Sequence, residues 1–421
     1  MKKHLLFLLA VLLTATATAQ TTRQAILRDL GRTGSNYFAY PGPVQTVLTP
    51  APEGYEPFYI SHFGRHGSRY MSNNEYYTKA IGALETAGEA GLLSARGKDV
   101  LAKLKIGYAD AFNRDGDLTA LGGRQHREIA HRLFERFPGL LSRPIAVDAK
   151  SSTSRRVMIS MFHFCAELQA LNPGLEIAMD ASSHDTHFTV ENSRVKVPET
   201  ARDAEYERIR SDIFEKAHDS RRLMRSLFTD ARRAGELVSG RELMEALYNV
   251  AEDLQNVPEL GIDLLDVFTK DELFNMWTGY NAGWLLNTGL VPGSAPKYLQ
   301  QKEVMDSLVA TADRAVRSDR PSATLRFSHD STVLPLAYML GLKEAMGATS
   351  DIRNIYKTIS IDRIIPMAAN IQLVFYRKAG SDEVLVKFLL NENETSIPVR
   401  TDCAPYYRWD DVKRYWEDRY R

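Results

Sequence analysis

The sequence has very little cysteine, no net charge and no long hydrophobic segment. Its 421 residues include two cysteines and no C-x-x-C pair, which excludes a zinc ribbon or a redox motif of that kind. The 53 basic and 53 acidic residues balance, so net charge does not draw the chain to nucleic acid or to anionic membranes. Any anion that the protein handles must therefore be held by a local site. Cys165 and Cys403 are far apart, and their spacing leaves open whether they pair or stay free thiols.

The N-terminal residues are typical of a secretory signal peptide. A basic start, Lys2-Lys3, precedes a short apolar run, Leu5 to Leu13. The small residues Ala17-Thr18-Ala19 then supply an A-x-A pattern, which predicts cleavage before Gln20. The apolar run is too short to span a membrane, which takes about 20 apolar residues. We therefore expect residues 1–19 to be removed and the protein to be exported, periplasmic or extracellular, with no membrane span.

Strand and helix patterns alternate near both ends of the chain, whereas its middle is mostly helical in pattern. Apolar runs predict strands at residues 58–61, 144–147, 323–327, 369–376 and 384–390. Helical periodicity covers residues 75–91, 122–137, 156–171 and 333–340, and Thr119 is a plausible N-cap for the second of these helices. This order predicts an α/β core flanked by helices, residues 20–178 and 320–421, with an inserted and mainly helical cap, residues 179–319.

The strongest chemical feature is the run Arg65-His66-Gly67-Ser68-Arg69, which follows a predicted strand directly. Guanidinium groups match phosphate oxygens in a bidentate way, and α/β sheets bind ligands at the carboxyl ends of their strands. A histidine among fixed cations is kept neutral, because its protonated form is repelled. A neutral imidazole can attack phosphorus and form a covalent intermediate. The pattern therefore predicts a phosphate site with His66 as nucleophile, although composition alone is also typical of a basic surface loop.

A metal site is the alternative interpretation, because His62 and His66 are four residues apart. That spacing joins two ligands on a helix, and Gly64 and Gly67 make a helix unfavourable here. No metal or other cofactor is required if arginines stabilise the transferred charge. We therefore expect a site without a metal.

Four segments in order resemble the motif blocks of the histidine acid phosphatases, the branch of the histidine phosphatase superfamily that includes phytases. The Arg-His-Gly-x-Arg run resembles the first block, and Leu118 to Gly122 followed by Gln125 resembles the second. Arg156 to Ser160 is similar to the block that supplies a third phosphate-binding arginine, and His329-Asp330-Ser331-Thr332 is similar to the C-terminal His-Asp motif. The resemblance covers about half the chain, residues 54–175 and 320–405, and it implies a mixed-sheet histidine phosphatase core.

The resemblance also implies a role for each of six residues. His66 would be the nucleophile, and Asp330 would protonate the departing oxygen and then assist attack by water. The phosphoryl oxygens would be held by the remaining four: Arg65, Arg69, Arg156 and His329. Each role has a chemical basis, since phosphoryl transfer needs charge stabilisation at the equatorial oxygens and a proton for the leaving alkoxide.

For the third arginine and for the His-Asp pair, the same sequence offers alternative residues. Arg155 is the alternative to Arg156, and the family spacing favours Arg156. His184-Asp185 repeats the His-Asp pair in a polar stretch without a clear strand before it, so we prefer His329-Asp330, whose Asp would otherwise only complement a helix N-terminus. Other histidines fall in predicted helices and are expected to be structural: His126, His131 and His163.

Features of the second half resemble bacterial multiple inositol polyphosphate phosphatases, namely the segments 182–185, 388–392 and 403–405. That group usually carries His-Ala-Glu as its C-terminal motif, whereas this chain has His329-Asp330. The expected function is hydrolysis of inositol polyphosphates or similar small phosphate esters through a phosphohistidine. The alternatives are a broad acid phosphatase, a glucose-1-phosphatase-like enzyme, and a phosphate-binding module without catalysis. The preferred ester, pH optimum and oligomeric state do not follow from the sequence.

Overall fold

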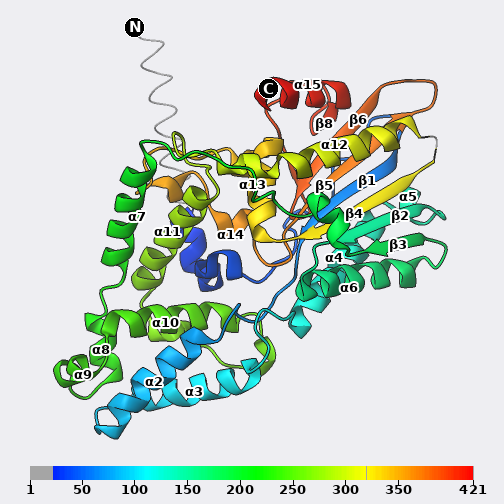
Figure 1. Cartoon of the computed structure of the whole chain (residues 1–421). Helices are drawn as coiled ribbons and strands as arrows, with labels where there is room; N and C mark the ends of the chain where they lie inside the picture. The colour runs from blue at the N-terminus through cyan, green and yellow to red at the C-terminus, as the bar shows by residue number, and fades with distance from the viewer. Residues whose placement is uncertain (1–21, 319, 421) are drawn as a thin grey trace.

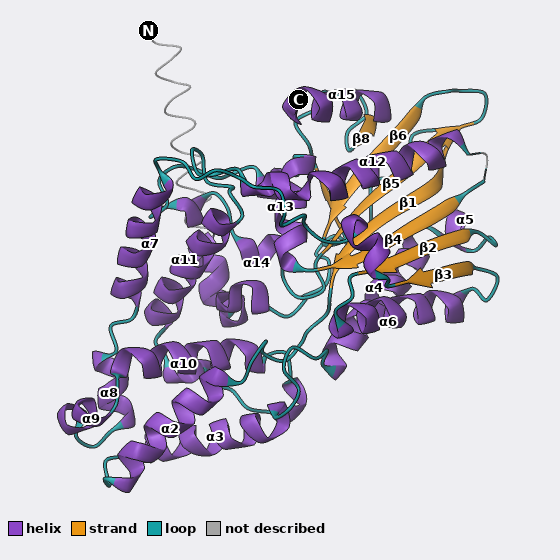
Figure 2. Cartoon of the chain, viewed as in Figure 1, coloured by secondary structure: helices purple, strands orange, loops and turns teal. Residues whose placement is uncertain are grey.

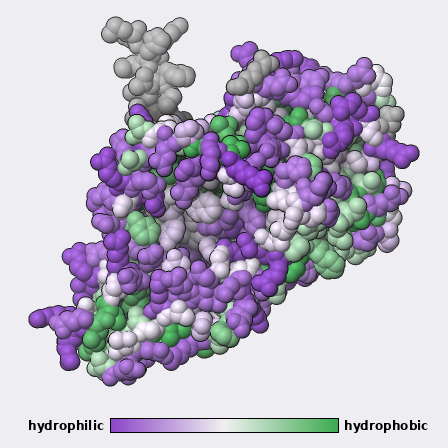
Figure 3. All heavy atoms as spheres, in the orientation of Figure 1, coloured by the Kyte–Doolittle hydropathy of each residue, from purple (hydrophilic) through white to green (hydrophobic). Residues whose placement is uncertain are grey.

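A mixed β-sheet occupies one part of the molecule and an all-helical region the other (Figures 1 and 2). The computed structural model describes residues 22–318 and 320–420, so the expected signal peptide, residues 1–19, lies outside the described residues. In this part of the chain no helix has the length and apolar character that crossing a bilayer requires. The face drawn in Figure 3 is mostly hydrophilic.

The sheet has the strand order β3-β2-β4-β1-β5-β6-β7, with β8 paired to β6. β1 to β4 run parallel to one another, and the strands from β5 onward are antiparallel to their neighbours. The predicted mixed α/β fold is thus confirmed. The strand bounds are β1 (Tyr55–Arg65), β2 (Ala146–Ser151), β3 (Glu176–Asp180), β4 (Ser322–Ser328), β5 (Asn370–Lys378), β6 (Val384–Leu390), β7 (Asn393–Thr395) and β8 (Tyr406–Arg408).

Helices cover both faces of the sheet, so its central strands are buried on both sides and carry near-continuous apolar runs. One face packs on α4 (Ala120–Arg136), α5 (Pro138–Leu141) and α6 (Arg155–Leu171). The other face packs on helices that come mostly from late in the chain: α12 (Lys302–Arg317), α13 (Asp330–Leu340), α14 (Ile361–Ile364) and α15 (Trp409–Tyr420). Successive side chains of β5 point to opposite faces of the sheet: Val374 packs with the cluster that includes α4 to α6, and Leu373 packs with the cluster that includes α12 to α15.

The helical region has an apolar core of its own, which lies away from the sheet (Figure 2). It contains α8 (Arg221–Leu227), α9 (Ala231–Leu237) and α10 (Gly240–Leu254) from the expected cap. Two helices from the expected core segment, α2 (Glu75–Glu89) and α3 (Ala95–Ala111), pack into the same cluster. α7 (Asp203–Ala217) packs on α11 (Lys270–Asn287), which links this region to the sheet region.

We propose that the chain divides into a core and a cap, with two changes to the expected bounds that these contacts support. α2 and α3 belong with the cap because they share its apolar cluster, and α12 belongs with the core because it lies on the sheet. The sequence pattern did not indicate either exchange, because helical periodicity says nothing about which partner buries the apolar face.

Candidate active site

The parallel pairing of β1 and β4 brings two distant motifs together. Arg65, the last residue of β1, is the register partner of Ser328, the last residue of β4. His66 and His329 therefore follow neighbouring strands at one edge of the sheet, and their ring centroids are 5.7 Å apart. β2 ends at the same edge, where Ser151 is paired with Phe327, and α6 begins three residues after Ser152. This is the edge at which parallel α/β sheets bind ligands.

His66 is held by its main chain on both sides. Its backbone N–H donates to the carbonyl of Ser328 at 3.0 Å, and its own carbonyl accepts from Ala368 N–H at 2.9 Å. The ring Nδ1 lies 2.9 Å from the carbonyl oxygen of Gly67. A carbonyl can only accept, so Nδ1 carries the proton and Nε2 has the lone pair. This is the tautomer that a nucleophile attacking through Nε2 requires.

His66 is also kept neutral by its surroundings. The side chain is buried, and burial lowers the pKa of His66 well below its ordinary value. The positive charges of Arg65, Arg69 and Arg156 lower this pKa further, because they repel the imidazolium form. The lone pair on Nε2 is therefore available even in acidic solution.

Arg65 and Asp330 form an ion pair beside His66. Nη2 of the fully buried Arg65 lies 2.6 Å from Oδ2 of Asp330, and Nη1 donates to the carbonyl of Ile365 at 2.7 Å. Burial alone would raise the pKa of Asp330, but the charge of Arg65 and a hydrogen bond from Asn36 hold it at about 2. Asp330 is thus a carboxylate in the unliganded protein at any ordinary pH.

Two further arginines point toward the same region from different elements. Arg69 stacks on the ring of Tyr37, with its guanidinium carbon 4.7 Å from the ring centroid, and both of its terminal nitrogens lie 3.3 Å from the Tyr37 hydroxyl. Nη2 of Arg156 lies 3.4 Å from Nδ1 of His329. In the described residues the buried Nε of Arg65, Arg69 and Arg156 has no hydrogen-bond partner. Three unpaired cationic donors in one buried region suit an anion with several oxygens.

The structure separates the two competing arginines. Arg155 points away from the cluster, with its side chain 73% exposed and ion-paired to Asp117 at 3.0 Å. Arg156 is near His329, and the positive charge of Arg156 contributes to the lowered pKa of His66. The geometry thus favours Arg156 over Arg155, as the motif spacing does.

His329 is oriented by two partners. Its Nε2 lies 3.0 Å from the hydroxyl of Ser152, and its Nδ1 faces Arg156, which can only donate. Nδ1 therefore accepts, and Nε2 carries the proton. Burial, with the charge of Arg156, lowers the pKa of His329 to about 4. A neutral His329 has one N–H, on Nε2, which faces the Ser152 hydroxyl here and can turn to an oxygen of a bound anion without adding a full charge.

The second and third motif blocks support the loop after β1. The predicted N-cap is confirmed, since the Thr119 hydroxyl accepts from Gly122 N–H at 3.2 Å. A Cβ at Gly67 would lie 2.5 Å from the carbonyl oxygen of Gly122, so glycine is required by the close approach of α4. Gln125 forms two hydrogen bonds with Ser68: its side-chain oxygen accepts from the Ser68 N–H at 2.8 Å, and its side-chain nitrogen donates to the Ser68 hydroxyl at 2.9 Å.

His62 and the His184-Asp185 pair lie in other surroundings. His62 lies in a strand, where residues four apart are separated by about 13 Å, and it packs between Phe164 and Phe327. In residues 22–318 and 320–420 no three or more His, Cys, Asp or Glu are grouped as metal ligands. Asp185 is ion-paired to Lys150, its Oδ1 lies 2.9 Å from Nδ1 of His184, and the hydrogen bonds from these two hold the pKa of Asp185 at about 2.

Three residues at the cluster were missed by sequence reasoning. Asn36 and Tyr37 belong to the 3₁₀ helix η1 (Leu30–Tyr37), in a segment that carried no motif. Asp253, near the end of α10, accepts from Met71 N–H at 3.1 Å, and burial raises its pKa to about 7 despite the opposing charge of Arg69. Only the approach of these segments in space connects them with the site, and no spacing in the sequence predicts that approach.

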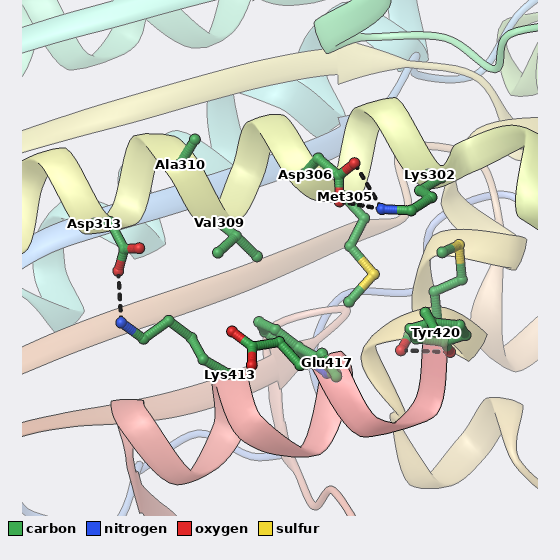
Figure 4. Close-up of a pocket in the computed structure, with 11 residues that line it drawn as sticks. Lys302, Met305, Asp306, Val309, Ala310, Asp313, Lys413, Glu417 and Tyr420 are labelled. Carbon is green, nitrogen blue, oxygen red and sulfur yellow. Dashed lines mark hydrogen bonds and ion pairs between the residues drawn. The ribbon is translucent and has the colours of Figure 1, made fainter.

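A large cavity lies elsewhere, between α12 and α15 (Figure 4). Its volume is about 540 Å³, and two ion pairs, Lys302 with Asp306 and Lys413 with Asp313, flank an apolar floor that includes Met305. It contains none of the six residues predicted for the site. Its chemistry offers no cluster of cations for phosphate, so we place the candidate site at the strand ends.

Comparisons with known proteins agree with the fold. No family model matches the chain. The human protein "Multiple inositol polyphosphate phosphatase 1" is 24% identical over 397 residues, covering 84% of this chain and 77% of that protein. A Bifidobacterium longum multiple inositol polyphosphate phosphatase solved with phosphate superposes with a TM-score of 0.72 at 22% identity, covering 91% and 97% of the two chains.

A more distant solved structure, a phytase from D. castellii, gives a TM-score of 0.65 at 14% identity, over 92% of this chain and 85% of that one. These likenesses establish the fold: a mixed sheet with flanking helices. The expected resemblance to the histidine acid phosphatase family is confirmed. The proteins that the chain is similar to are named multiple inositol polyphosphate phosphatase and phytase.

Proposed function

We propose that the protein is a phosphomonoesterase that hydrolyses inositol polyphosphates or similar small phosphate esters through a phosphohistidine on His66. The observation that carries this proposal is the convergence of a neutral, Nδ1-protonated His66 with three arginines at the ends of parallel strands. The human and Bifidobacterium relatives, which are named for inositol polyphosphates, support the substrate class.

In the first chemical step, the lone pair on Nε2 of His66 attacks phosphorus while the bond from phosphorus to the ester oxygen breaks. Arg65, Arg69 and Arg156 hold the equatorial oxygens, where charge is spread in the transition state. His329 donates a hydrogen bond to the same group. These are the roles that the unpaired guanidinium donors suit.

The leaving oxygen takes its proton from Asp330, which gives the free alcohol and a phosphohistidine. In the second step, Asp330 accepts a proton from a water molecule as that water attacks phosphorus. The bond from phosphorus to Nε2 breaks, inorganic phosphate leaves, and neutral His66 is restored. Asp330 then carries the proton again, and it returns this proton to solvent or to the departing phosphate.

The charge state of Asp330 determines where its first proton comes from. With a pKa of about 2, Asp330 is ionised before substrate binds. A phosphate monoester whose last proton is still present can supply it, because the bound dianion would compete for Arg65 and so raise the affinity of Asp330 for a proton. The reactive complex therefore combines an ionised ester with a protonated Asp330, and the proton arrives with the substrate.

We expect kcat/KM for an alkyl phosphate to fall about tenfold for each pH unit above about 6, where the monoester loses its last proton. Activity should persist at pH 5, because the pKa of His66 is well below its ordinary value. A histidine with the ordinary pKa of about 6.5 would be only about 3% neutral at that pH. The measurement is kcat/KM from pH 4 to 8 for an alkyl ester and a nitrophenyl ester. A basic limb equally steep for both esters would contradict delivery of the proton by the substrate.

The substrate class is tested by phosphate release from four kinds of compound: phytate, glucose 1-phosphate, phosphoglycerates and an aryl phosphate. We expect the highest kcat/KM for phytate or partly phosphorylated inositols. Because the His329-Asp330 pair is also the form seen in general acid phosphatases, comparable turnover of all four would assign a broad acid phosphatase. Preference for glucose 1-phosphate would assign a glucose-1-phosphatase-like enzyme. Binding of phosphate without release from any ester would leave only the binding module.

We also propose that the protein is exported, with residues 1–19 as its signal peptide. The support is the basic, apolar and small-residue order at the N-terminus. A substrate that is a small, highly charged ester is compatible with this location, since a protein outside the cytoplasm meets phosphate esters from its surroundings. N-terminal sequencing of the secreted protein tests the cleavage before Gln20.

A further inference from the structure

Asn36 contacts both members of the ion pair at the candidate acid. Its side-chain amide Nδ2 donates to Oδ2 of Asp330 at 2.9 Å. Its main-chain carbonyl accepts from Nη1 of Arg65 at 2.5 Å, and Nη2 of Arg65 lies 2.6 Å from the same Oδ2. The three residues form a closed ring of contacts. None of the motif blocks includes Asn36, which lies almost thirty residues before Arg65.

The segment that carries Asn36 is fixed from several directions. The Thr33 hydroxyl donates to Glu252 at 2.6 Å, and the Tyr248 hydroxyl donates to the carbonyl of Thr33 at 2.6 Å. Ser35, which directly precedes Asn36, has φ +59° and ψ −117°, a backbone conformation that non-glycine residues rarely adopt. Such a residue persists only where its surroundings hold it in place. The anchoring of η1 on α10 thus determines where the Asn36 amide points.

The contacts on the Asp330 carboxylate are uneven. Oδ2 accepts from both Arg65 and Asn36, whereas Oδ1 accepts only from the N–H of the adjacent Ser331, at 2.9 Å. A single arginine contact would let the carboxylate turn about its own axis, and a second donor on the same oxygen prevents this. Oδ1 is consequently the oxygen that remains for the proton.

We infer that Asn36 is a positioning residue for proton transfer: its amide holds Oδ2 of Asp330 against Arg65 so that Oδ1 carries the proton to the leaving oxygen. This role rests on the proposed function, because it acts through Asp330 as the acid. It also gives the N-terminal segment before the sheet a direct part in the chemistry. Misplacement of a reacting group by about 1 Å can cost about 10²-fold in rate.

The test is Asn36→Leu, which has the same number and branching of side-chain heavy atoms, lacks the amide donor and keeps the main-chain carbonyl for Arg65. In single-turnover experiments, we expect release of the alcohol from an alkyl phosphate to slow about 10- to 100-fold. Release of nitrophenolate should slow by no more than about threefold, because that leaving group needs little help from an acid. The basic limb of kcat should also move to higher pH, since the amide favours the ionised form of Asp330.

Tyr37→Phe is the matched control on the same 3₁₀ helix. It removes the hydroxyl that faces Arg69, which holds phosphate oxygens of every substrate. We therefore expect equal losses for the alkyl and the nitrophenyl ester. Asn36→Leu added to Asp330→Asn should cause little further loss on the alkyl ester, because residues that act as one unit are not additive.

The outcomes separate this inference from the proposed function. Equal losses for both esters in Asn36→Leu, with a leaving-group difference in Asp330→Asn, would overturn the role of Asn36 and keep Asp330 as the acid. Absence of that difference in Asp330→Asn would overturn the acid itself. If Asn36→Leu does not fold, Asn36→Ala is measured in the same way and is judged by the same difference between the two esters.

Discussion

Replacement of His66 by alanine should lower turnover of every phosphate ester by about 10⁴-fold or more, on the scale of losses that follow removal of a covalent nucleophile. The reason is that no other neutral imidazole in the cluster presents Nε2 as a lone pair, since His329 uses that nitrogen as a donor. Rapid quenching of the unaltered protein during turnover should trap phosphate as an acid-labile, base-stable phosphoramidate. The label should be absent from His66→Ala.

The control variant is His131→Ala. His131 lies on α4, about half exposed and hydrogen-bonded to Glu167, outside the cluster of arginines. This variant should keep both the label and the turnover. His66→Ala should still bind inorganic phosphate, because its arginines are unchanged. Near-normal turnover in His66→Ala would require another nucleophile or an activated water in its place.

Asp330→Asn should slow phosphorylation by alkyl esters about 10²–10⁴-fold, equivalent to roughly 3–5 kcal/mol of barrier, and by a nitrophenyl ester much less. An alkyl ester expels a strongly basic alkoxide that needs a proton, whereas nitrophenolate can leave unaided. Asparagine keeps an oxygen that can accept from the buried Arg65, so the ring of contacts is retained while the proton is lost. Burst kinetics separate this step from the attack by water, in which Asp330 also takes part.

Asp185→Asn is the matched control for this experiment. Asp185 also directly follows a histidine, but its partners are Lys150 and His184. We expect this variant to change the phosphorylation rate of the alkyl ester and of the nitrophenyl ester by the same factor. A leaving-group difference in Asp185→Asn, combined with equal burst losses in Asp330→Asn, would transfer the role of the acid to Asp185.

Much of the sheet could be predicted because its central strands are buried on both faces. β6 has the predicted bounds, β1 and β4 extend the predicted runs at both ends, and β5 begins one residue later and ends two residues later than predicted. β3 was missed because it lies at the sheet edge and most of its side chains, such as Glu176, are exposed, which removes the apolar pattern. The polar stretch with His184-Asp185 therefore does follow a strand, contrary to the interpretation of the sequence.

The six candidate site residues could be named from sequence because each belongs to a motif that directly follows a strand or begins a helix. The supporting residues could not. Asn36 and Asp253 have no motif, and they reach the site only because η1 and α10 pack beside the loop after β1. Their importance depends on contacts across more than 180 residues of chain. Sequence periodicity indicates that α10 has a buried face, but it does not indicate which polar group that face meets.

Because Arg65 and Ser328 are register partners, the two motifs that follow them meet whatever the length of chain between them. The ends of two neighbouring parallel strands fix the backbone positions of His66 and Asp330, whatever the length of the intervening segment. Apart from α10, which anchors η1 and carries Asp253, the helical region can therefore vary in length and sequence without moving the strand ends. An engineer who wishes to change which phosphate is removed would randomise loops of that region, leave the strand ends intact, and keep the anchoring of η1 on α10.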